Sequence, residues 1–226
     1  MPRATATRTY GGRTGSERRA ARRERLLDAG LELLGTEGYA ATTVRGACRA
    51  ARLTPRYFYE SFDDLDAFVT AVFEREVGEA TAHILSAYDA APDDAHGKAR
   101  AVIDACVRHL TDDPRRARVL FTEGLGDDGL AWRRLDTMHA VGHLIATTAR
   151  HFYGRQEDDD PIAELTGAML IGGFVESVTA WLDGRLQVDR EQLVEDLTEL
   201  WVVTGEGAVA IADRRATRRR SGKATR

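Results

Sequence analysis

The feature that most limits how this chain can fold is a pair of helix-start signals placed very close together. Thr43 can cap a short helix over residues 44–51, and Thr54 followed by Pro55 is the pattern of an N-cap and first helical residue for another. With only about three residues between them, the two helices must cross at a steep angle. The sequence therefore predicts a helix-turn-helix near the N-terminus.

A helix is expected on either side of this motif. Before it, one helix face carries an apolar stripe over residues 26–34, and Gly38 stands where a left-handed C-cap is needed. After it, a helix start at Asp63 or Asp64 opens a long amphipathic helix that reaches Tyr88. The N-terminal part is therefore expected to hold three helices, joined to the rest of the chain by the long one.

Charge is sorted along the chain in a way that favours a nucleic-acid partner for the N-terminal part. Residues 1–62 carry 12 arginines and 6 acidic residues, residues 63–213 carry 13 basic and 30 acidic residues, and residues 214–226 carry 7 basic and no acidic ones. A basic segment attracts the phosphate backbone, whereas an acidic remainder repels it and so orients the encounter. Basic ends can also serve solubility, so charge alone leaves the partner open.

The rest of the chain is helical in period, and no strand pattern is present. Breaks fall at residues 113–114, 124–129, 154–161 and 184–188. Gly184 is expected to end one of the last two helices, and Asp189 to cap the other. We therefore expect an all-α protein with a disordered basic arm (1–15), a helix-turn-helix domain (16–63), a helical domain (64–213) and a disordered basic tail (214–226).

The segment from Arg22 to Asp64 resembles the DNA-binding domain of the TetR family of transcriptional regulators. The matching features are the stripe of the first helix, the Gly38-Tyr39 corner, Thr42-Thr43-Val44 at the second helix, the turn Arg52-Leu53-Thr54, and Tyr59 with Phe62. The resemblance implies a homodimer with an N-terminal three-helix DNA-binding domain and a helical ligand-binding and dimerisation domain. It also implies a repressor that a small-molecule effector releases from a palindromic operator in double-stranded DNA.

The third helix supplies the residues expected to read DNA, since a recognition helix must be exposed and rich in donors at its N-terminal end. The resemblance implies that Pro55, Arg56 and Tyr57 face bases and that Tyr59 binds a phosphate; arginine to guanine is the commonest specific contact. Phe58 and Phe62 are expected to pack inward, because three consecutive aromatics cannot all face one side of a helix. The full predicted DNA-binding set is Thr43, Arg45, Thr54, Pro55, Arg56, Tyr57, Tyr59 and Ser61.

Three positions depart from the family pattern. Arg52 stands where the family usually has a glycine, so a left-handed backbone there costs about 1 kcal/mol. Ala47-Cys48 replaces the usual Ile-Ala, which thins the core. Leu65 takes the place of a lysine that commonly contacts DNA, and we expect arginines of the N-terminal arm to supply that phosphate contact instead.

The resemblance implies that the helices after residue 64 bind a ligand and that the last two pair with a second subunit. Large or polar side chains inside apolar runs are the ligand-site candidates: Phe121, Trp132, Met138, His139, His143, Met169, Phe174 and Glu176. Glu176 is the most unusual, because a buried carboxylate needs a partner. The dimer-interface candidates are Gly172, Val178, Trp181, Leu193, Leu197 and Trp201, with Gly167 and Gly173 allowing close helix approach; the same stripes can instead bury against the protein's own domain.

Two other classes of function stay open. His139 and His143 have the spacing of metal ligands on a helix, but no third histidine, cysteine or HExxH glutamate accompanies them. No GxSxG, P-loop or GxGxxG motif occurs, so we expect no enzyme, metal or cofactor. A DNA-binding protein without an effector is the nearer alternative. No run of about 18 apolar residues and no signal peptide is found, which predicts a cytoplasmic protein without a membrane partner.

Overall fold

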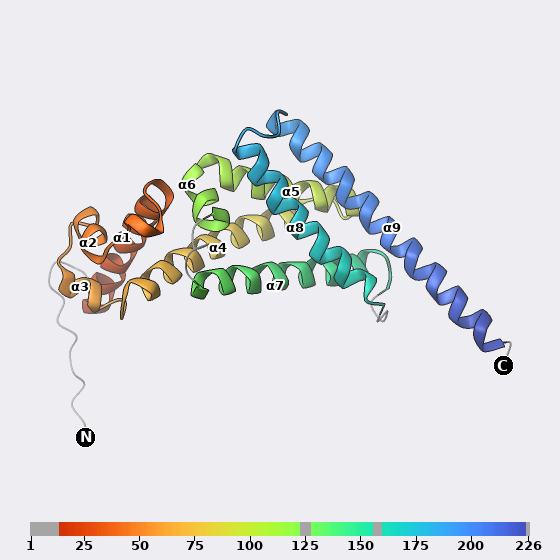
Figure 1. Cartoon of the computed structure of the whole chain (residues 1–226), viewed down its shortest axis with the longest axis horizontal. Helices are drawn as coiled ribbons and strands as arrows, with labels where there is room; N and C mark the ends of the chain where they lie inside the picture. Colours follow the sequence, from red (N-terminus) through yellow and green to blue (C-terminus); the bar gives the residue numbers. More distant parts are fainter. Residues whose placement is uncertain (1–13, 123–127, 156–159, 225–226) are drawn as a thin grey trace, which may run out of the picture. The chain divides into compact units, whose positions relative to one another are not determined.

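The computed structural model describes residues 14–122, 128–155 and 160–224, and these residues form helices joined by turns (Figure 1). No strand occurs among them, which confirms the all-α prediction. The elements are α1 (Gly15–Thr36), η1 (Tyr39–Ala41), α2 (Val44–Ala50), α3 (Pro55–Tyr59), α4 (Leu65–Ala90), α5 (Ala95–Asp112), α6 (Pro114–Ala117), η2 (Arg118–Thr122), α7 (Asp128–Phe152), α8 (Ile162–Leu182) and α9 (Arg190–Ala224).

The chain forms two compact units, and α4 contributes to both. The first unit comprises residues 1–79 and 113–129, and the second comprises residues 80–112 and 130–226. The expected boundary at residue 64 lies before this division, because the first half of α4 packs on α1. A Cβ added to Gly30 of α1 would lie 2.4 Å from Val72 Cγ2 and 2.7 Å from Phe68 Cζ, so only glycine allows α4 to come this close.

Three aromatic rings fill the core of the first unit. The three buried rings are those of Phe58 on α3, Phe62 between α3 and α4, and Phe68 on α4. Their ring centroids lie 5.2 to 5.5 Å apart in tilted and edge-to-face arrangements. The prediction that Phe58 and Phe62 pack inward is confirmed. Each buried ring stabilises the unit by about 1.5 to 3 kcal/mol through the apolar surface removed from water.

A buried charge cluster ties α6 to the same unit. The Glu76 side chain of α4 is fully buried, with Arg75 Nη2 at 3.0 Å and Arg116 Nε at 3.5 Å from its carboxylate oxygens. Burial raises the pKa of Glu76, and the two arginines oppose this shift. Arg75 also donates to Asp28 of α1 at 2.7 Å, so the cluster connects three helices.

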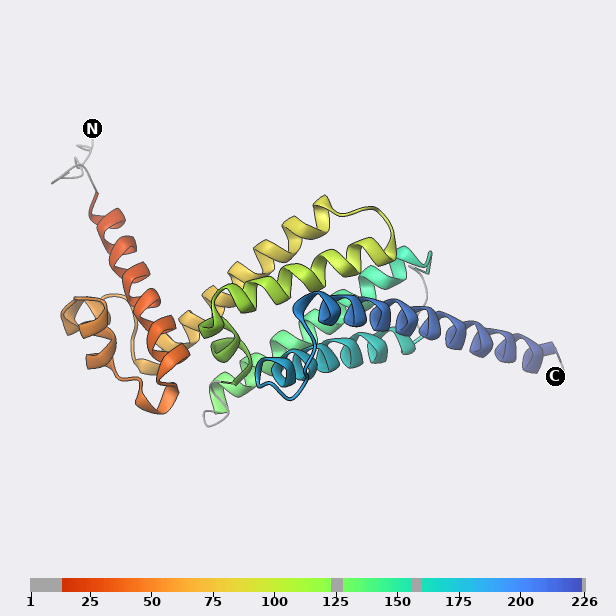
Figure 2. The same ribbon diagram turned by 90° about the horizontal axis from the view of Figure 1, so that it is seen from above.

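The second unit is a bundle in which α9 runs alongside α5 and α8 (Figure 2). Helices α7 and α8 touch backbone to backbone, since a Cβ on Gly167 would lie 2.1 Å from the carbonyl oxygen of Gly142. The predicted helix ends are confirmed: Gly184 follows α8 with φ +72°, and Asp189 Oδ1 accepts the Gln192 N–H at 2.8 Å before α9. These caps fix the turn between the last two helices.

The basic C-terminal segment is not the disordered tail that we predicted. Helix α9 continues through it to Ala224, and in Figures 1 and 2 this end of α9 extends past α8. Arg215 and Arg219 stand one turn apart and bind the buried carboxylate of Asp160, at 2.7 and 3.3 Å. These two ion pairs supply a helical contact that composition alone does not reveal.

Helix α8 has an exposed apolar surface. By length and composition alone it could cross a membrane, with a mean hydropathy of 1.4, although Thr, Gly, Glu and Ser interrupt its apolar residues. One such helix is weak evidence for a membrane span, since core helices of globular proteins pass the same test. Its packing on α7 and α9 and its uncovered apolar face instead suit a helix that has a further protein partner.

Candidate nucleic-acid interface and ligand cavity

Local signals hold α2 and α3 in place. Thr43 Oγ1 accepts the Gly46 N–H at 3.0 Å and so caps α2, while Pro55 opens α3 as its first residue. Between them Arg52 has φ +54°, which is the left-handed conformation expected at a position where the TetR family usually has a glycine. Among the described residues no other non-glycine residue has a positive φ. The Leu53 N–H then bonds the Cys48 carbonyl at 2.9 Å and closes the turn.

The predicted DNA-binding residues lie on one short stretch of α2 and α3, and most are exposed. Thr43, Arg45, Thr54, Pro55 and Arg56 are exposed, Tyr59 is 60% exposed, and Tyr57 and Ser61 are half-buried. Ser61 Oγ donates to the Tyr57 carbonyl at 3.2 Å, which explains its partial burial. The structure thus presents this set at the surface, and none of its members is needed to fill the core.

Glu60 binds two arginines, Arg56 of α3 and Arg22 of α1. Its carboxylate lies 3.3 Å from Arg56 Nε and 3.3 Å from Arg22 Nη2. Arg22 also stacks over the Tyr57 ring, with 4.3 Å between the guanidinium carbon and the ring centroid. Arg56 is 84% exposed, so its bond to Glu60 is weak and readily exchanged for another acceptor.

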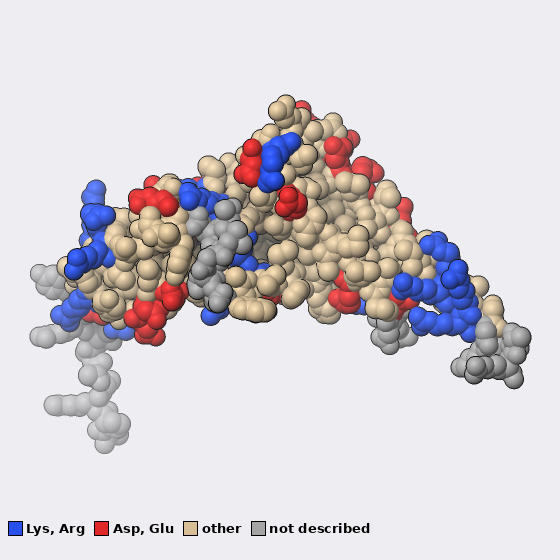
Figure 3. Space-filling model, in the orientation of Figure 1, with Lys and Arg blue, Asp and Glu red and all other residues tan. Residues whose placement is uncertain are grey.

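Figure 3 shows lysine and arginine side chains gathered over the part of the molecule that carries α1 to α3. Arg19, Arg45, Arg49 and Arg52 are exposed there together with Arg56. Such a face attracts phosphates.

The start of α4 differs from this basic face. Asp64 caps α4 by accepting the Ala67 N–H at 2.7 Å, and Asp66 accepts the Tyr39 hydroxyl at 2.8 Å. Leu65 is half-buried between them. This corner therefore suits a phosphate poorly, in agreement with the departure noted at Leu65, while arm residues 1–13 lie outside the described part of the chain.

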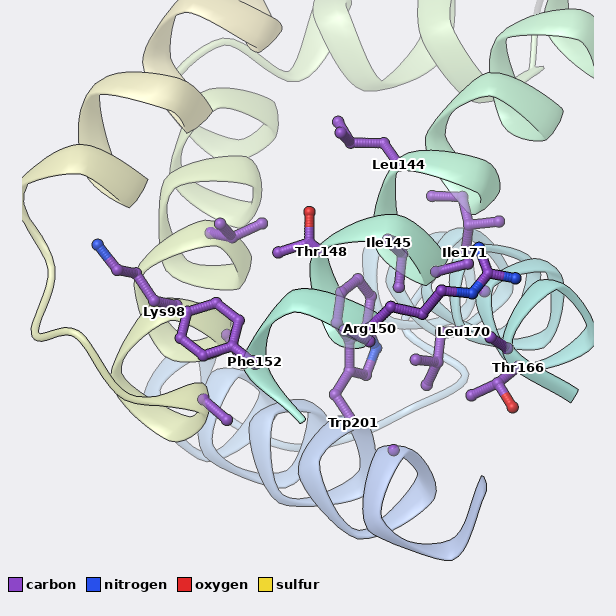
Figure 4. Close-up of a pocket in the computed structure, with 18 of the residues that line it drawn as sticks. Lys98, Leu144, Ile145, Thr148, Arg150, Phe152, Thr166, Leu170, Ile171 and Trp201 are labelled. Carbon is purple, nitrogen blue, oxygen red and sulfur yellow. The ribbon is translucent and has the colours of Figure 1, made fainter. Parts of the chain in front are cut away.

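The second unit contains a partly open cavity of about 420 Å³. Its walls are almost entirely apolar and come from five helices (Figure 4). They include Ile84 and Tyr88 of α4; Lys98, Ile103 and Cys106 of α5; Leu144, Ile145, Thr148, Arg150 and Phe152 of α7; Thr166, Leu170, Ile171 and Phe174 of α8; and Trp201 and Val209 of α9. Burial here raises the pKa of the Cys106 thiol to about 12. This size and lining fit a drug-sized apolar ligand.

Four charged residues also line the cavity, and three have partners of opposite charge. Arg150 binds Glu164 at 3.0 Å, Arg155 binds Asp213 at 2.5 Å, and Asp160 holds the arginines of α9. The hydrogen bond from the Ile162 N–H, with the neighbouring arginines, keeps the pKa of the Asp160 carboxyl below its usual range. The fourth, Lys98, bonds only the Tyr88 carbonyl and ring among the described residues.

Sequence reasoning found little of this cavity. Of the eight ligand-site candidates only Phe174 lines it. Trp132, His139, His143, Met169 and Glu176 are exposed, Met138 is half-buried away from the lining, and Phe121 belongs to the first unit. The prediction of a buried Glu176 was therefore wrong, because this face of α8 is uncovered in the described chain. A detectable signal was missed: Lys98 lies in the apolar stripe formed with Ala95, Val102 and Cys106 on α5.

The dimer-interface candidates divide into two groups. Val178, Leu193 and Leu197 are buried within the subunit, at 0, 4 and 6% exposure, so they leave a partner little side-chain surface to contact. Trp181 and Trp201 are half-buried, and Trp201 stacks edge-on against Phe174. Gly172 has no atom within 4 Å of an added Cβ and is open to a neighbour. The exposed apolar stripe lies instead at Leu165, Met169, Leu200 and Val203.

The two histidines considered as metal ligands, His139 and His143, do not belong to a metal-binding cluster of described residues. His143 Nδ1 lies 3.2 Å from Glu164, and His139 is exposed on α7. Among the described residues no group of three or more His, Cys, Asp or Glu side chains is placed to hold a metal ion.

A short, exposed, arginine-bearing helix that follows a tight turn defines a helix-turn-helix DNA-binding protein. The family model of bacterial regulatory proteins of the tetR family matches residues 26–72, which covers α2, α3 and the parts of α1 and α4 that pack on them. Residues 26–72 of this chain thus match the DNA-binding domain of TetR-family transcription regulators. No curated protein sequence matches the chain.

Solved structures extend the likeness to the helical second unit. The fatty acid degradation regulator FadR from Bacillus halodurans is similar over 80% of this chain and 94% of its own, with a TM-score of 0.67 and 21% identity. FadR from Bacillus subtilis, in complex with stearoyl-CoA, covers 79% and 97% with a TM-score of 0.66 and 18% identity. A TetR-like regulator from Rhodococcus sp. RHA1 covers 84% and 97% with a TM-score of 0.63 and 15% identity. At these identities the likeness establishes the fold alone.

Proposed function

We propose that this chain is a cytoplasmic, homodimeric repressor that binds a palindromic operator through α2 and α3 and leaves it when a small molecule fills the cavity. The observation that carries the proposal is the exposed donor face of a helix-turn-helix in which Thr43 caps α2, with Arg56 exposed on α3. Thr43, Arg45 and Thr54 add donors from α2 and the turn, and Tyr59 offers its hydroxyl at the edge. Arg56 reads a base, and Tyr59 with the surrounding arginines holds phosphates.

The exposed stripe on α8 and α9 supports the dimer. Leu165, Met169, Leu200 and Val203 are each more than half exposed in the single chain, and contiguous apolar side chains of this kind mark protein interfaces. Gly172 lets a partner helix approach the α8 backbone closely. A second copy is the natural occupant, because proteins of this fold use a two-fold axis to place two recognition helices about one DNA turn, roughly 34 to 36 Å, apart.

The apolar cavity supports an effector, and it favours a molecule with a long hydrocarbon part. Walls from five helices enclose it, so a ligand there touches every helix of the second unit. The structurally similar FadR from Bacillus subtilis was solved with stearoyl-CoA, a ligand of this kind. The alternative, a DNA-binding protein without an effector, gives no role to a ligand-sized cavity.

The test is selection of bound duplexes from a random pool, followed by titration of acyl compounds against the selected complex. We expect an inverted repeat and release of DNA by at least one long-chain compound. A single asymmetric half-site bound by a monomer in light scattering would contradict the dimer. An inverted repeat that no apolar compound releases would favour the effector-independent alternative. Arg185 is an exposed arginine of the second unit. The variant Arg185→Met is therefore the matched control for substitutions of arginines on the DNA-binding face, and it should bind the selected site as wild type does.

A further inference from the structure

We propose that Lys98 is the counter-ion for the anionic head group of the ligand, so that the cavity takes an amphiphile with a hydrocarbon chain and a terminal anion. The proposal rests on the ligand site proposed above and names the chemistry of its occupant. It starts from a lysine on an otherwise apolar wall.

The Lys98 side chain is only 9% exposed. Its Nζ donates to the Tyr88 carbonyl at 2.7 Å and lies 4.5 Å from the centroid of the Tyr88 ring. An ammonium group has three donors, and a nearly buried charge is costly unless it is paired and hydrogen-bonded. Neither a carbonyl dipole nor an aromatic ring neutralises it, and no carboxylate among the described residues does so.

A purely structural role for Lys98 explains less of this geometry. Tyr88 is in the last turn of α4, where carbonyls lack helical partners, and a cation near a helix C-terminus is favourable. The Tyr88 carbonyl, however, already accepts the Ala91 N–H at 3.3 Å. The two lone pairs of the carbonyl can accept both bonds, but this capping engages only one of the three ammonium donors of a lysine in the wall of a cavity.

The other cations of the cavity are already paired. Arg150 has Glu164 and Arg155 has Asp213, which leaves Lys98 as the unneutralised charge among the described lining residues. Figure 4 shows Lys98 beside Phe152 at one side of the cavity, with the Arg150 guanidinium at the other. In this view the Lys98 Nζ points away from the other labelled side chains, so an anion bound to it would lie at this end of the cavity, and Trp201 and Leu170 line the apolar walls farther along.

The anion can be the carboxylate of a free fatty acid or a phosphate of an acyl-CoA, and both offer oxygens to the two remaining Lys98 donors.

The probes are dodecanoate, dodecanoyl-CoA and the neutral 1-dodecanol. Binding to the full-length protein is measured by isothermal titration calorimetry. We expect wild-type protein to bind at least one anionic probe about ten- to a hundred-fold more tightly than the alcohol.

Lys98→Met keeps the length and apolar stem but removes the charge, and it should reduce the affinity for the preferred anionic probe to that for the alcohol. Lys98→Arg should retain the preference. Arg185→Met, which changes an exposed arginine outside the cavity, should behave as wild type. Stronger Lys98-dependent binding of dodecanoate identifies a carboxylate, whereas stronger binding of dodecanoyl-CoA identifies a CoA phosphate.

The outcomes separate this proposal from the one on which it rests. If wild-type protein binds the alcohol and both anions with equal affinity, Lys98 is not a counter-ion, but the cavity is still a site for an apolar ligand. This result needs only the wild-type protein, so it does not depend on whether Lys98→Met folds. Undiminished anion preference in a folded Lys98→Met also overturns the role of Lys98. If wild-type protein binds none of the three probes, the proposed ligand site itself fails.

Discussion

Replacing Arg52 by glycine should stabilise the helix-turn-helix. Arg52 has φ +54°, and a side chain in the left-handed region costs about 1 to 2 kcal/mol because its Cβ crowds the backbone. Glycine removes that cost but gives the unfolded chain more freedom, which takes back about 0.5 to 1 kcal/mol. The net expectation is a gain of about 0.5 to 1 kcal/mol for Arg52→Gly. The backbone carbonyl of residue 52, which accepts from Arg25 at 3.4 Å, stays in place.

The matched control is Arg52→Ala, which removes the same cation but keeps a Cβ at positive φ. Alanine should therefore give no gain. Both variants should lose equal affinity for DNA if Arg52 holds a phosphate, with the slope of log affinity against log salt falling by about 0.9 per subunit. Comparing the two variants thus isolates the backbone effect from the charge effect.

Amide hydrogen exchange is the appropriate assay, since all three tryptophans, Trp132, Trp181 and Trp201, belong to the second unit and their fluorescence would miss the change. Amides of α2 and α3 should exchange about two- to five-fold more slowly in Arg52→Gly than in Arg52→Ala. If the glycine variant exchanges as fast as the alanine variant, the strain argument is wrong.

Three further substitutions test the packing and the DNA face. Gly167→Ala places a Cβ against the backbone of α7 and should lower the free energy of unfolding by about 1 to 3 kcal/mol. Gly78→Ala, where a Cβ meets open space, should raise the free energy of unfolding by about 0.5 to 1 kcal/mol. Similar thermal unfolding of the two variants in circular dichroism would refute the contact between α7 and α8. Arg56→Ala should cost about 1 to 3 kcal/mol and relax specificity at one base pair, while Tyr59→Phe should weaken all duplexes alike; equal losses on selected and random DNA for Arg56→Ala would contradict base reading. Glu60→Gln frees both arginines that Glu60 holds, Arg22 and Arg56, and removes a negative charge that repels the DNA phosphates. DNA affinity should therefore rise a few-fold in anisotropy titrations, and a fall at every salt concentration would count against that role.

The DNA-binding half of the fold could be predicted because its signals are local. A threonine cap, a proline at the first helical position and a glycine at a helix end each act within a few residues, and Thr43, Pro55 and Gly38 appear where they were expected. The backbone strain at Arg52 could also be predicted, because Arg52 stands where the family usually has a glycine. The exposure of Arg56 follows from the same local geometry.

The ligand cavity could not be predicted in the same way, because its walls come from five helices whose faces are chosen by packing. An apolar stripe does not reveal whether it meets its own subunit or a second one, and Leu193 and Leu197 turned out to face inward. The helical tail was missed for a related reason. It contacts Asp160, which lies far away in the sequence and meets Arg215 and Arg219 only after folding.

The most direct test of DNA reading by α2 and α3 is an anisotropy titration of the selected duplex against one with the same bases shuffled, at a single physiological salt concentration. The account predicts that the selected duplex binds about a thousand-fold or more tightly, with two subunits per site, and that Arg56→Ala narrows this ratio. Equal affinity of the wild-type protein for the two duplexes would contradict it.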